Sequence, residues 1–292
     1  MGNLRGIGLV VFSMAAFAVE DAIIKALTAD LPVGEVLAAL GLGGSLLFFL
    51  IAGDHGRSWL IRALRHPTVV IRTLCEGVSG ATFVTALSTV PISTVAAVFQ
   101  ATPLAVTAGA ALFMGEPVGW RRWAAVVAGF AGVLLIIRPG LAGFQPMALL
   151  VLVTVAAIAV RDLITRRVPE AVPSMVISFY GFFAVLVTGL AMLAFADAPR
   201  MPTAAQGALM AAAVLTGGAG YYAIVASMRL ADASALMPFR YARLVFSLMI
   251  GVAVFGERPD AATLAGATIV ILAAFYAYLR ERRAGKSAGT AQ

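Results

Sequence analysis

The chain has 292 residues, of which 61% are hydrophobic and only 12% are charged, and its mean hydropathy is +0.97. Because soluble domains carry roughly 25% charged residues, this composition excludes a soluble globular protein and indicates one that is embedded in a membrane. The net charge of +7 comes from basic residues spread over the loops between apolar runs, which is typical of membrane orientation and not of a nucleic-acid-binding face.

Ten apolar runs follow one another along the chain, and each is long enough to cross a bilayer, which takes about 20 residues per helix. Charged residues and prolines separate the runs and mark their ends. The predicted spans are 5–27, 33–53, 68–87, 92–114, 120–138, 146–165, 173–195, 204–228, 233–255 and 262–280. The polar segment 284–292 is predicted to be a disordered cytoplasmic tail. The sequence therefore predicts an all-α integral membrane protein with ten transmembrane helices.

The distribution of lysine and arginine predicts how the chain crosses the membrane. With the N-terminus in the cytoplasm, thirteen of these residues fall in cytoplasmic segments and four at the outer ends of the spans. This excess follows the positive-inside rule, so we expect a multi-pass protein of the cytoplasmic (inner) membrane with both termini cytoplasmic. The first run contains Glu20 and Asp21, whereas the core of a signal peptide is uncharged, so this run is predicted to be a retained span.

A duplication emerges when each residue is compared with the one 141 positions later. The matching residues include Val19 and Val160, Asp21 and Asp162, Pro32 and Pro173, Gly77 and Gly218, Ser93 and Ser234, Ala101 and Ala242, and Gly115-Glu116 and Gly256-Glu257. The offset divides the chain into a first five-helix repeat, 1–141, and a second, 142–283. Because each repeat has an odd number of spans, the second enters the membrane from the opposite side. Inverted repeats are typical of secondary transporters, which expose a midplane site to each side in turn.

Both repeats contain a helix rich in small residues that ends in Gly-Glu, followed by a short turn and a Gly/Ala-rich helix. The two copies are Ala96 to Pro117 with Ala124 to Arg138, and Met237 to Pro259 with Ala262 to Tyr276. In this pattern the chain resembles the drug/metabolite transporter superfamily, and within it the ten-helix EamA-type exporters, over essentially its whole length. The YddG-type amino-acid exporters are the most similar in organisation. The resemblance implies a secondary transporter that exports amino acids, related metabolites or drugs by alternating access.

Five charged residues lie well inside the predicted spans, namely Glu20, Glu76, Arg161, Arg240 and Arg243. Each charge at the centre of a span costs about 2.5–3.5 kcal/mol on the insertion scale, so these side chains are expected to face a polar cavity or to pair with one another. In the first interpretation they bind a zwitterionic substrate, with arginine for a carboxylate and glutamate for an ammonium group. In the second they are internal ion pairs that hold helices together.

Uncharged residues near these positions complete the predicted substrate site. Ser79 follows Glu76 by three residues, on the same helix face, and the pair Phe99-Gln100 comes just before Pro103, which is expected to bend its helix. The remaining candidates are the tyrosines Tyr221, Tyr222 and Tyr241. A ring with a hydroxyl group suits a cavity wall, but ordinary packing between helices accounts for these tyrosines equally well.

Other charged residues favour a structural interpretation. Asp21 precedes Lys25 by four residues, and Asp162 precedes Arg166 by four, so each pair is predicted to anchor a helix near its end. The two Gly-Glu turns are also predicted to be structural, with the glycine as a C-terminal helix cap.

Other functional classes fit the sequence less well. An intramembrane enzyme needs a nucleophile with a base, or metal ligands, at membrane depth. Neither His55 nor His66 lies inside a span, so we predict no enzyme activity and no cofactor. A channel would show a ring of like residues from repeated subunits. An exporter of drugs or nucleotide derivatives with the same fold is the alternative hypothesis. The expected partners are a small-molecule substrate and membrane lipid, without nucleic acid, and we expect a monomer.

Overall fold

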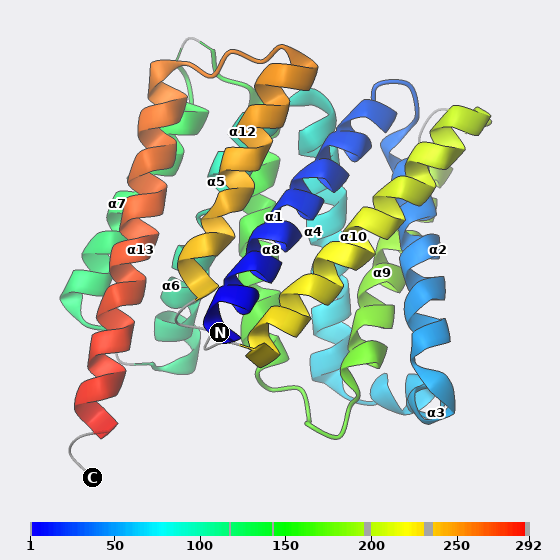
Figure 1. Cartoon of the computed structure of the whole chain (residues 1–292), viewed down its shortest axis with the longest axis horizontal. Helices are drawn as coiled ribbons and strands as arrows, with labels where there is room; N and C mark the ends of the chain where they lie inside the picture. Colours follow the sequence, from blue (N-terminus) through cyan, green and yellow to red (C-terminus); the bar gives the residue numbers. More distant parts are fainter. Residues whose placement is uncertain (1, 117, 142, 196–199, 231–235, 290–292) are drawn as a thin grey trace. The chain divides into compact units, whose positions relative to one another are not determined.

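The computed structural model describes residues 2–289 except 117, 142, 196–199 and 231–235, and it confirms that this part of the protein is all-α (Figure 1). The helices of the first repeat are α1 (Gly2–Leu27), α2 (Val33–Ile51), α3 (Gly53–Ala63), α4 (Pro67–Thr89), α5 (Ile92–Phe99), α6 (Thr102–Met114) and α7 (Trp120–Ile137). Those of the second are the 3-10 helix η1 (Pro146–Ala148), α8 (Leu149–Thr165), α9 (Ser174–Phe195), α10 (Ala204–Leu230), the 3-10 helix η2 (Met237–Tyr241), α12 (Ala242–Phe255) and α13 (Ala261–Gly289).

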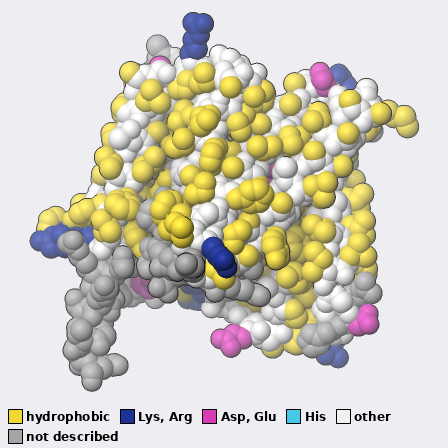
Figure 2. All heavy atoms as spheres, viewed as in Figure 1, with side chains coloured by type: hydrophobic (Ala, Val, Ile, Leu, Met, Phe, Trp, Pro, Cys, Tyr) yellow, Lys and Arg dark blue, Asp and Glu magenta, His cyan; other side chains and the backbone are white. Residues whose placement is uncertain are grey.

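Nine helical segments in the described part of the chain are long and apolar enough to cross a membrane. One of them, Ile92–Met114, consists of α5 and α6 together. The remaining predicted span, 233–255, contains η2 and α12, and its first three positions lie outside the described residues. Hydrophobic side chains cover most of the face seen in Figure 2, and the visible charged side chains lie mainly near its margins. Such a surface is suited to contact with lipid.

The chain forms two compact units, and each takes residues from both repeats. Unit 1 comprises residues 1–18, 91–149 and 219–292, and unit 2 comprises residues 19–90 and 150–218. In unit 2, α2 packs along α9; in unit 1, α7 packs along α13 and α5 packs against α12 (Figure 1). The helices of the α2–α9 pair and of the α7–α13 pair are equivalent under the offset of 141 residues, whereas the equivalent of α12 is α6. Each unit is therefore built from matching helices of the two repeats.

The two matching pairs run antiparallel, and glycines let their backbones approach closely. In unit 2, a Cβ atom added to Gly34, early in α2, would lie 2.8 Å from the carbonyl oxygen of Gly189, late in α9. Gly44, late in α2, meets the ring of Phe182, early in α9. In unit 1, a Cβ atom on Gly132 of α7 would lie 2.9 Å from the carbonyl oxygen of Gly266 in α13. Antiparallel packing of equivalent helices is what an inverted repeat requires, and it confirms that prediction.

The predicted span 92–114 is broken in the middle, between α5 and α6. Pro103 has no N–H to donate to the carbonyl oxygen of Phe99. The hydroxyl of Thr102 donates to that oxygen instead, at 2.6 Å, and the N–H of Ala101 bonds to Val98, at 3.0 Å, in the tighter 3-10 pattern. The bend expected at Pro103 is therefore present as an interruption that places Gln100 and Ala101 outside both helices.

The short helix α3 was missed by the sequence analysis because its eleven residues are too few and too polar to span a membrane. It packs against α9, and the hydroxyl of Tyr180 donates a hydrogen bond to the carbonyl oxygen of Leu60. Ala63, at its end, belongs to a buried core with Val69 and Val176. A second difference lies at the C-terminus, where α13 continues as a helix to Gly289, into the segment for which we expected disorder.

The two Gly-Glu turns are helix C-caps, as predicted. Gly115 and Gly256 have positive φ angles of 69° and 62°, in the left-handed region that glycine tolerates best. The carboxylate of Glu257 has a further role, because it accepts hydrogen bonds from the backbone N–H of Ile92 at 2.6 Å and of Ser93 at 3.1 Å. It also accepts one from the Ser93 hydroxyl at 2.7 Å. Glu257 thus caps the N-terminus of α5 from the turn that follows α12.

Replacing Glu257 by alanine is expected to destabilise the protein by about 0.5–2 kcal/mol, the usual effect of losing an N-cap. Pro91, which precedes α5, has no side-chain acceptor that could take over this role. The measurement is the midpoint of thermal unfolding in detergent. Glu170→Ala is the matched control, because Glu170 is exposed in the loop before α9, and equal midpoints for the two variants would contradict the capping role.

Candidate functional site

The residues of the predicted substrate site fall into two groups, one in each unit. Unit 2 contains Glu20, Glu76, Ser79 and Arg161, and unit 1 contains Phe99, Gln100, Tyr221, Tyr222, Arg240, Tyr241 and Arg243. Within these groups, the structure brings Glu76 together with Arg161, and Phe99 together with Arg243. These two contacts define two polar centres inside the predicted spans, which we describe in turn.

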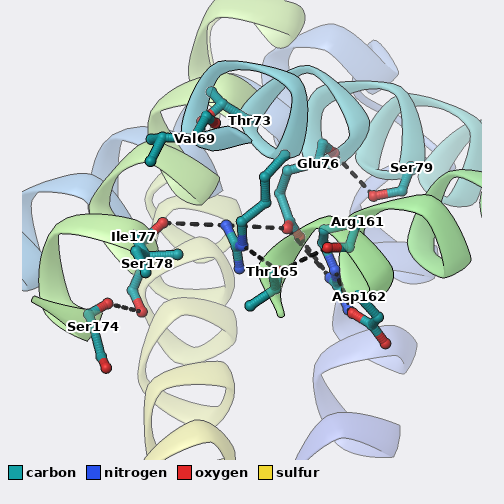
Figure 3. A network of polar contacts seen from close by, with 11 residues as sticks. Val69, Thr73, Glu76, Ser79, Arg161, Asp162, Thr165, Ser174, Ile177 and Ser178 are labelled. Atoms are coloured by element: carbon teal, nitrogen blue, oxygen red, sulfur yellow. Dashed lines mark hydrogen bonds and ion pairs between the residues drawn. The ribbon is translucent and has the colours of Figure 1, made fainter. Parts of the chain in front are cut away.

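The centre in unit 2 is a network of charged side chains from α4 and α8 (Figure 3). The Arg161 guanidinium donates from Nη1 to both carboxylate oxygens of Glu76, at 3.0 and 3.2 Å. Its Nε and Nη2 donate to one oxygen of Asp162, at 2.9 and 2.8 Å. The side chains of Glu76 and Arg161 are each only about one-fifth exposed. A guanidinium between two carboxylates is well satisfied at this depth.

Arg72, which the sequence analysis did not single out, joins the same network. Its Nη1 lies 3.9 Å from a Glu76 oxygen, one helical turn along α4, and also donates to the carbonyl oxygen of Ile177 in α9, at 3.3 Å. Its Nε donates to the Thr165 hydroxyl at 3.0 Å. The i,i+4 spacing of Arg72 and Glu76 was the signal that could have found it. Two arginines thus balance two carboxylates, which matches the internal ion pairs of the second interpretation.

The other predicted residues of unit 2 have separate surroundings. The Ser79 hydroxyl is buried and donates to the carbonyl oxygen of Glu76, at 3.0 Å. The carboxylate of Glu20 lies against Gly217 of α10, where a Cβ atom would come within 2.7 Å of Glu20 Cδ. The ammonium group of Lys25 donates to the carbonyl oxygens of Leu87 and Val90, at 3.0 and 2.6 Å. Lys25 therefore satisfies the C-terminus of α4, where a cation is favoured.

The centre in unit 1 is formed around Arg243, near the start of α12. Its guanidinium carbon lies 5.0 Å from the ring centre of Phe99, at the end of α5, and 5.5 Å from that of Phe17 in α1. Both distances fall in the range of cation–π attraction. Phe17 was also missed by the sequence analysis, because one phenylalanine in an apolar helix carries no distinguishing signal. Because the face of a ring has no oxygen acceptor, the contact with these rings forms no N–H···O hydrogen bond from the guanidinium.

Buried polar groups accompany Arg243 in unit 1. Gln100, in the break between α5 and α6, is 8% exposed. Ser247, one helical turn after Arg243, is fully buried, and its hydroxyl has no hydrogen-bond partner among the described residues. A buried hydroxyl without a partner is unusual, because nearly all buried polar groups are hydrogen-bonded. This side of α12 therefore carries a cation and a hydroxyl inside a predicted span.

The aromatic candidates of unit 1 differ in their positions. Tyr241 packs against the buried core that includes Leu104 and Ala274, which is the ordinary packing considered as the alternative for the tyrosines. Tyr222 is 74% exposed on α10, and Tyr221 is half-buried. Arg240 is exposed. In the described part of the chain, no group of three or more potential metal ligands comes together.

Comparisons with known proteins agree with this architecture. Two successive segments, residues 4–138 and 145–279, match the model of the EamA-like transporter family. The chain is 26% identical over 284 residues to a protein of Rickettsia felis named S-adenosylmethionine uptake transporter, covering 96% of this chain and 95% of that protein. It is 30% identical over 220 residues to a riboflavin transporter of Rhizobium johnstonii, covering 75% of this chain and 71% of that protein.

Two further comparisons concern the whole length of the chain. A pseudopaline exporter of Pseudomonas aeruginosa is 24% identical over 273 residues, which cover 92% of this chain and 94% of that protein. A solved crystal structure with 21% sequence identity superimposes with a TM-score of 0.57 and covers 94% of this chain and 96% of its own. At this identity the likeness concerns the fold alone.

Proposed function

Because this chain belongs to the EamA-like transporter family, we propose that it exports amino acids or amino-acid-derived metabolites across the cytoplasmic membrane by alternating access. Its relatives carry the names of transporters and not of enzymes, and small-molecule transport across a membrane is the activity of the family. The substrate class, the direction and the mechanism are the parts that we propose, and the following paragraphs give their support.

The observation that carries the proposal is the position of Arg243. Its guanidinium lies over the rings of Phe17 and Phe99, which come from two other helices of unit 1. A charge at this depth costs about 2.5–3.5 kcal/mol on the insertion scale, and intramembrane ionisable residues mark substrate pathways. The planar guanidinium binds both oxygens of a carboxylate, and the two rings provide apolar contact for the rest of a metabolite. This combination suits an amino acid.

The direction of net transport by a carrier of this kind depends on the concentration gradient of the substrate, because alternating access can carry the substrate either way across the membrane. One relative is named for uptake and another for export. We propose net export, in keeping with the resemblance to amino-acid exporters. One relative is named for a methionine derivative, which supports the amino-acid class. A second candidate substrate is a flat-ring metabolite such as riboflavin, favoured by the relative at 30% identity and by the aromatic pair around Arg243.

Counterflow in proteoliposomes tests the substrate class. Vesicles loaded with an unlabelled mixture of the common amino acids, S-adenosylmethionine and riboflavin are diluted into the same compounds in labelled form at low concentration. We expect transient accumulation of at least one amino acid or of S-adenosylmethionine, and none in protein-free vesicles. Exchange of riboflavin without exchange of any amino acid or of S-adenosylmethionine would contradict the proposed substrate class. Absence of all exchange by folded protein would contradict the proposal as a whole.

A further inference from the structure

A pocket of about 210 Å³ lies at one end of unit 1 and is lined by none of the residues of the predicted substrate site. Its walls come from the start of α5, the end of α7, the connection between α7 and α8, and the turn between α12 and α13. In the orientation predicted from the basic residues, this end faces the outside of the cell. The volume is below the roughly 300 Å³ at which sites for drug-sized ligands begin, so it suits a ligand of amino-acid size.

The two carboxylates that line this pocket are already bonded within the protein. Glu257 accepts the three hydrogen bonds from Ile92 and Ser93 that cap α5. Asp260 accepts one bond from the Arg138 guanidinium and another from the Thr263 backbone N–H, the latter at 2.8 Å. These bonds, with that from Arg138 the strongest influence, hold the pKa of the Asp260 carboxyl well below its ordinary value. The oxygens of both carboxylates are therefore already used by donors within the protein.

Three other side chains that line the pocket are not hydrogen-bonded in this way. The side chains of Arg258, Gln145 and Thr94 form no hydrogen bond or ion pair with any residue that the structure describes. Arg258 and Gln145 are exposed, and Thr94 is half-buried. The pocket thus offers one guanidinium, one amide and one hydroxyl to a ligand, while Asp260 is paired with Arg138 and the carboxylate of Glu257 is held at the N-terminus of α5. A guanidinium in this setting selects a carboxylate.

We propose that this pocket is a second binding site, for a small carboxylate-bearing metabolite at the outer face of the protein. Arg258 binds the carboxylate, and Gln145 and Thr94 form hydrogen bonds with the other polar groups of the ligand. The ligand class rests on the proposed function, since a metabolite released outward passes this face. The charge preference of the pocket rests on the structure alone.

The test measures that charge preference by the rate of thiol modification. Gln145 is replaced by cysteine after Cys75, the single cysteine of the chain, has been changed to alanine. Intact cells are then treated with two membrane-impermeant methanethiosulfonates, one bearing a sulfonate and one a trimethylammonium group. We expect the anionic reagent to react faster, and Arg258→Gln to lower the anionic-to-cationic rate ratio on the order of fivefold, the effect of one nearby charge in water. A mixture of the common amino acids is expected to slow the reaction.

Met201→Cys, in the same Cys75→Ala background, is the matched control. Met201 is 97% exposed in a loop of unit 2, and its rate ratio should respond neither to Arg258→Gln nor to amino acids. The site would be overturned if Arg258→Gln left the rate ratio at position 145 unchanged, or if amino acids did not slow the reaction there. Modification only in inside-out vesicles would overturn its outward position. Counterflow by the Cys75→Ala protein, measured in parallel, shows whether the proposed function stands when the site fails.

Discussion

Replacing Arg243 by glutamine is expected to lower the initial rate of amino-acid counterflow by about 10- to 100-fold, because a hydrogen bond to a charged group contributes about 1.5–3 kcal/mol. Glutamine fills much of the same space but lacks the positive charge and the planar fork. The counterflow rate of Arg243→Lys should lie between those of the original protein and Arg243→Gln. Lysine keeps the charge and the attraction to Phe17 and Phe99, but it binds a carboxylate as a point charge. The measurement is counterflow at several substrate concentrations, normalised to the amount of folded protein.

Arg121→Gln is the control for the general loss of a positive charge. Arg121 is exposed at the start of α7, beside Trp120, and its replacement should leave counterflow within about twofold of the original. Full activity of Arg243→Gln would remove Arg243 from the substrate site, although the fold and the family would stand. A large loss in both variants would show that the assay responds to net charge and not to the site.

The second large effect concerns the charged network of α4 and α8. Arg161→Gln is expected to destabilise the protein by about 3 kcal/mol, because it leaves the Glu76 and Asp162 carboxylates without their main donor at membrane depth. Glu76→Gln leaves Arg161 with Asp162 as its remaining carboxylate, so its cost should be smaller. The measurement is the unfolding free energy in detergent titrated with a denaturing surfactant.

A double-mutant cycle distinguishes the two interpretations of this network. If Glu76 and Arg161 form an internal ion pair, the variant with both replaced by glutamine should lose less stability than the sum of the two single variants. If the two residues bind substrate separately, the losses should be small and additive, while counterflow falls in each single variant. Additive stability effects together with normal counterflow would contradict both interpretations. Glu170→Gln, in an exposed loop, provides the baseline.

The spans and the repeat could be predicted from the sequence because both are local properties. Hydropathy together with Pro173 placed α9 within one residue of its observed start and at its observed end, Ser174–Phe195. The Gly-Glu turns at Gly115 and Gly256 were identified by comparing positions at one offset, and their positive φ angles agree with the cap that glycine favours. The antiparallel pairing of matching helices then follows from the odd number of spans in each repeat.

The partners of the charged residues could not be predicted in the same way. Glu76 and Arg161 are 85 positions apart, and which face of α4 meets α8 depends on packing that no local pattern reveals. The sequence left ion pairs and a substrate cavity as alternatives, and it gave no reason to include Phe17 beside Arg243. Helix α3 was missed because it neither spans the membrane nor continues an apolar run. Long-range packing decides all of these features.

The division of the chain into two units has a consequence for biosynthesis. Every residue of unit 2 has been made once Gly218 leaves the ribosome, whereas unit 1 also needs the final helix, α13. The glycine-containing face of α7 therefore has no helix to pack against until α13 has been synthesised, which takes about the second half of the chain. A single helix can wait in lipid because its backbone groups are already bonded to one another. Unit 2 can therefore be completed before unit 1, which cannot be completed until α13 has been made.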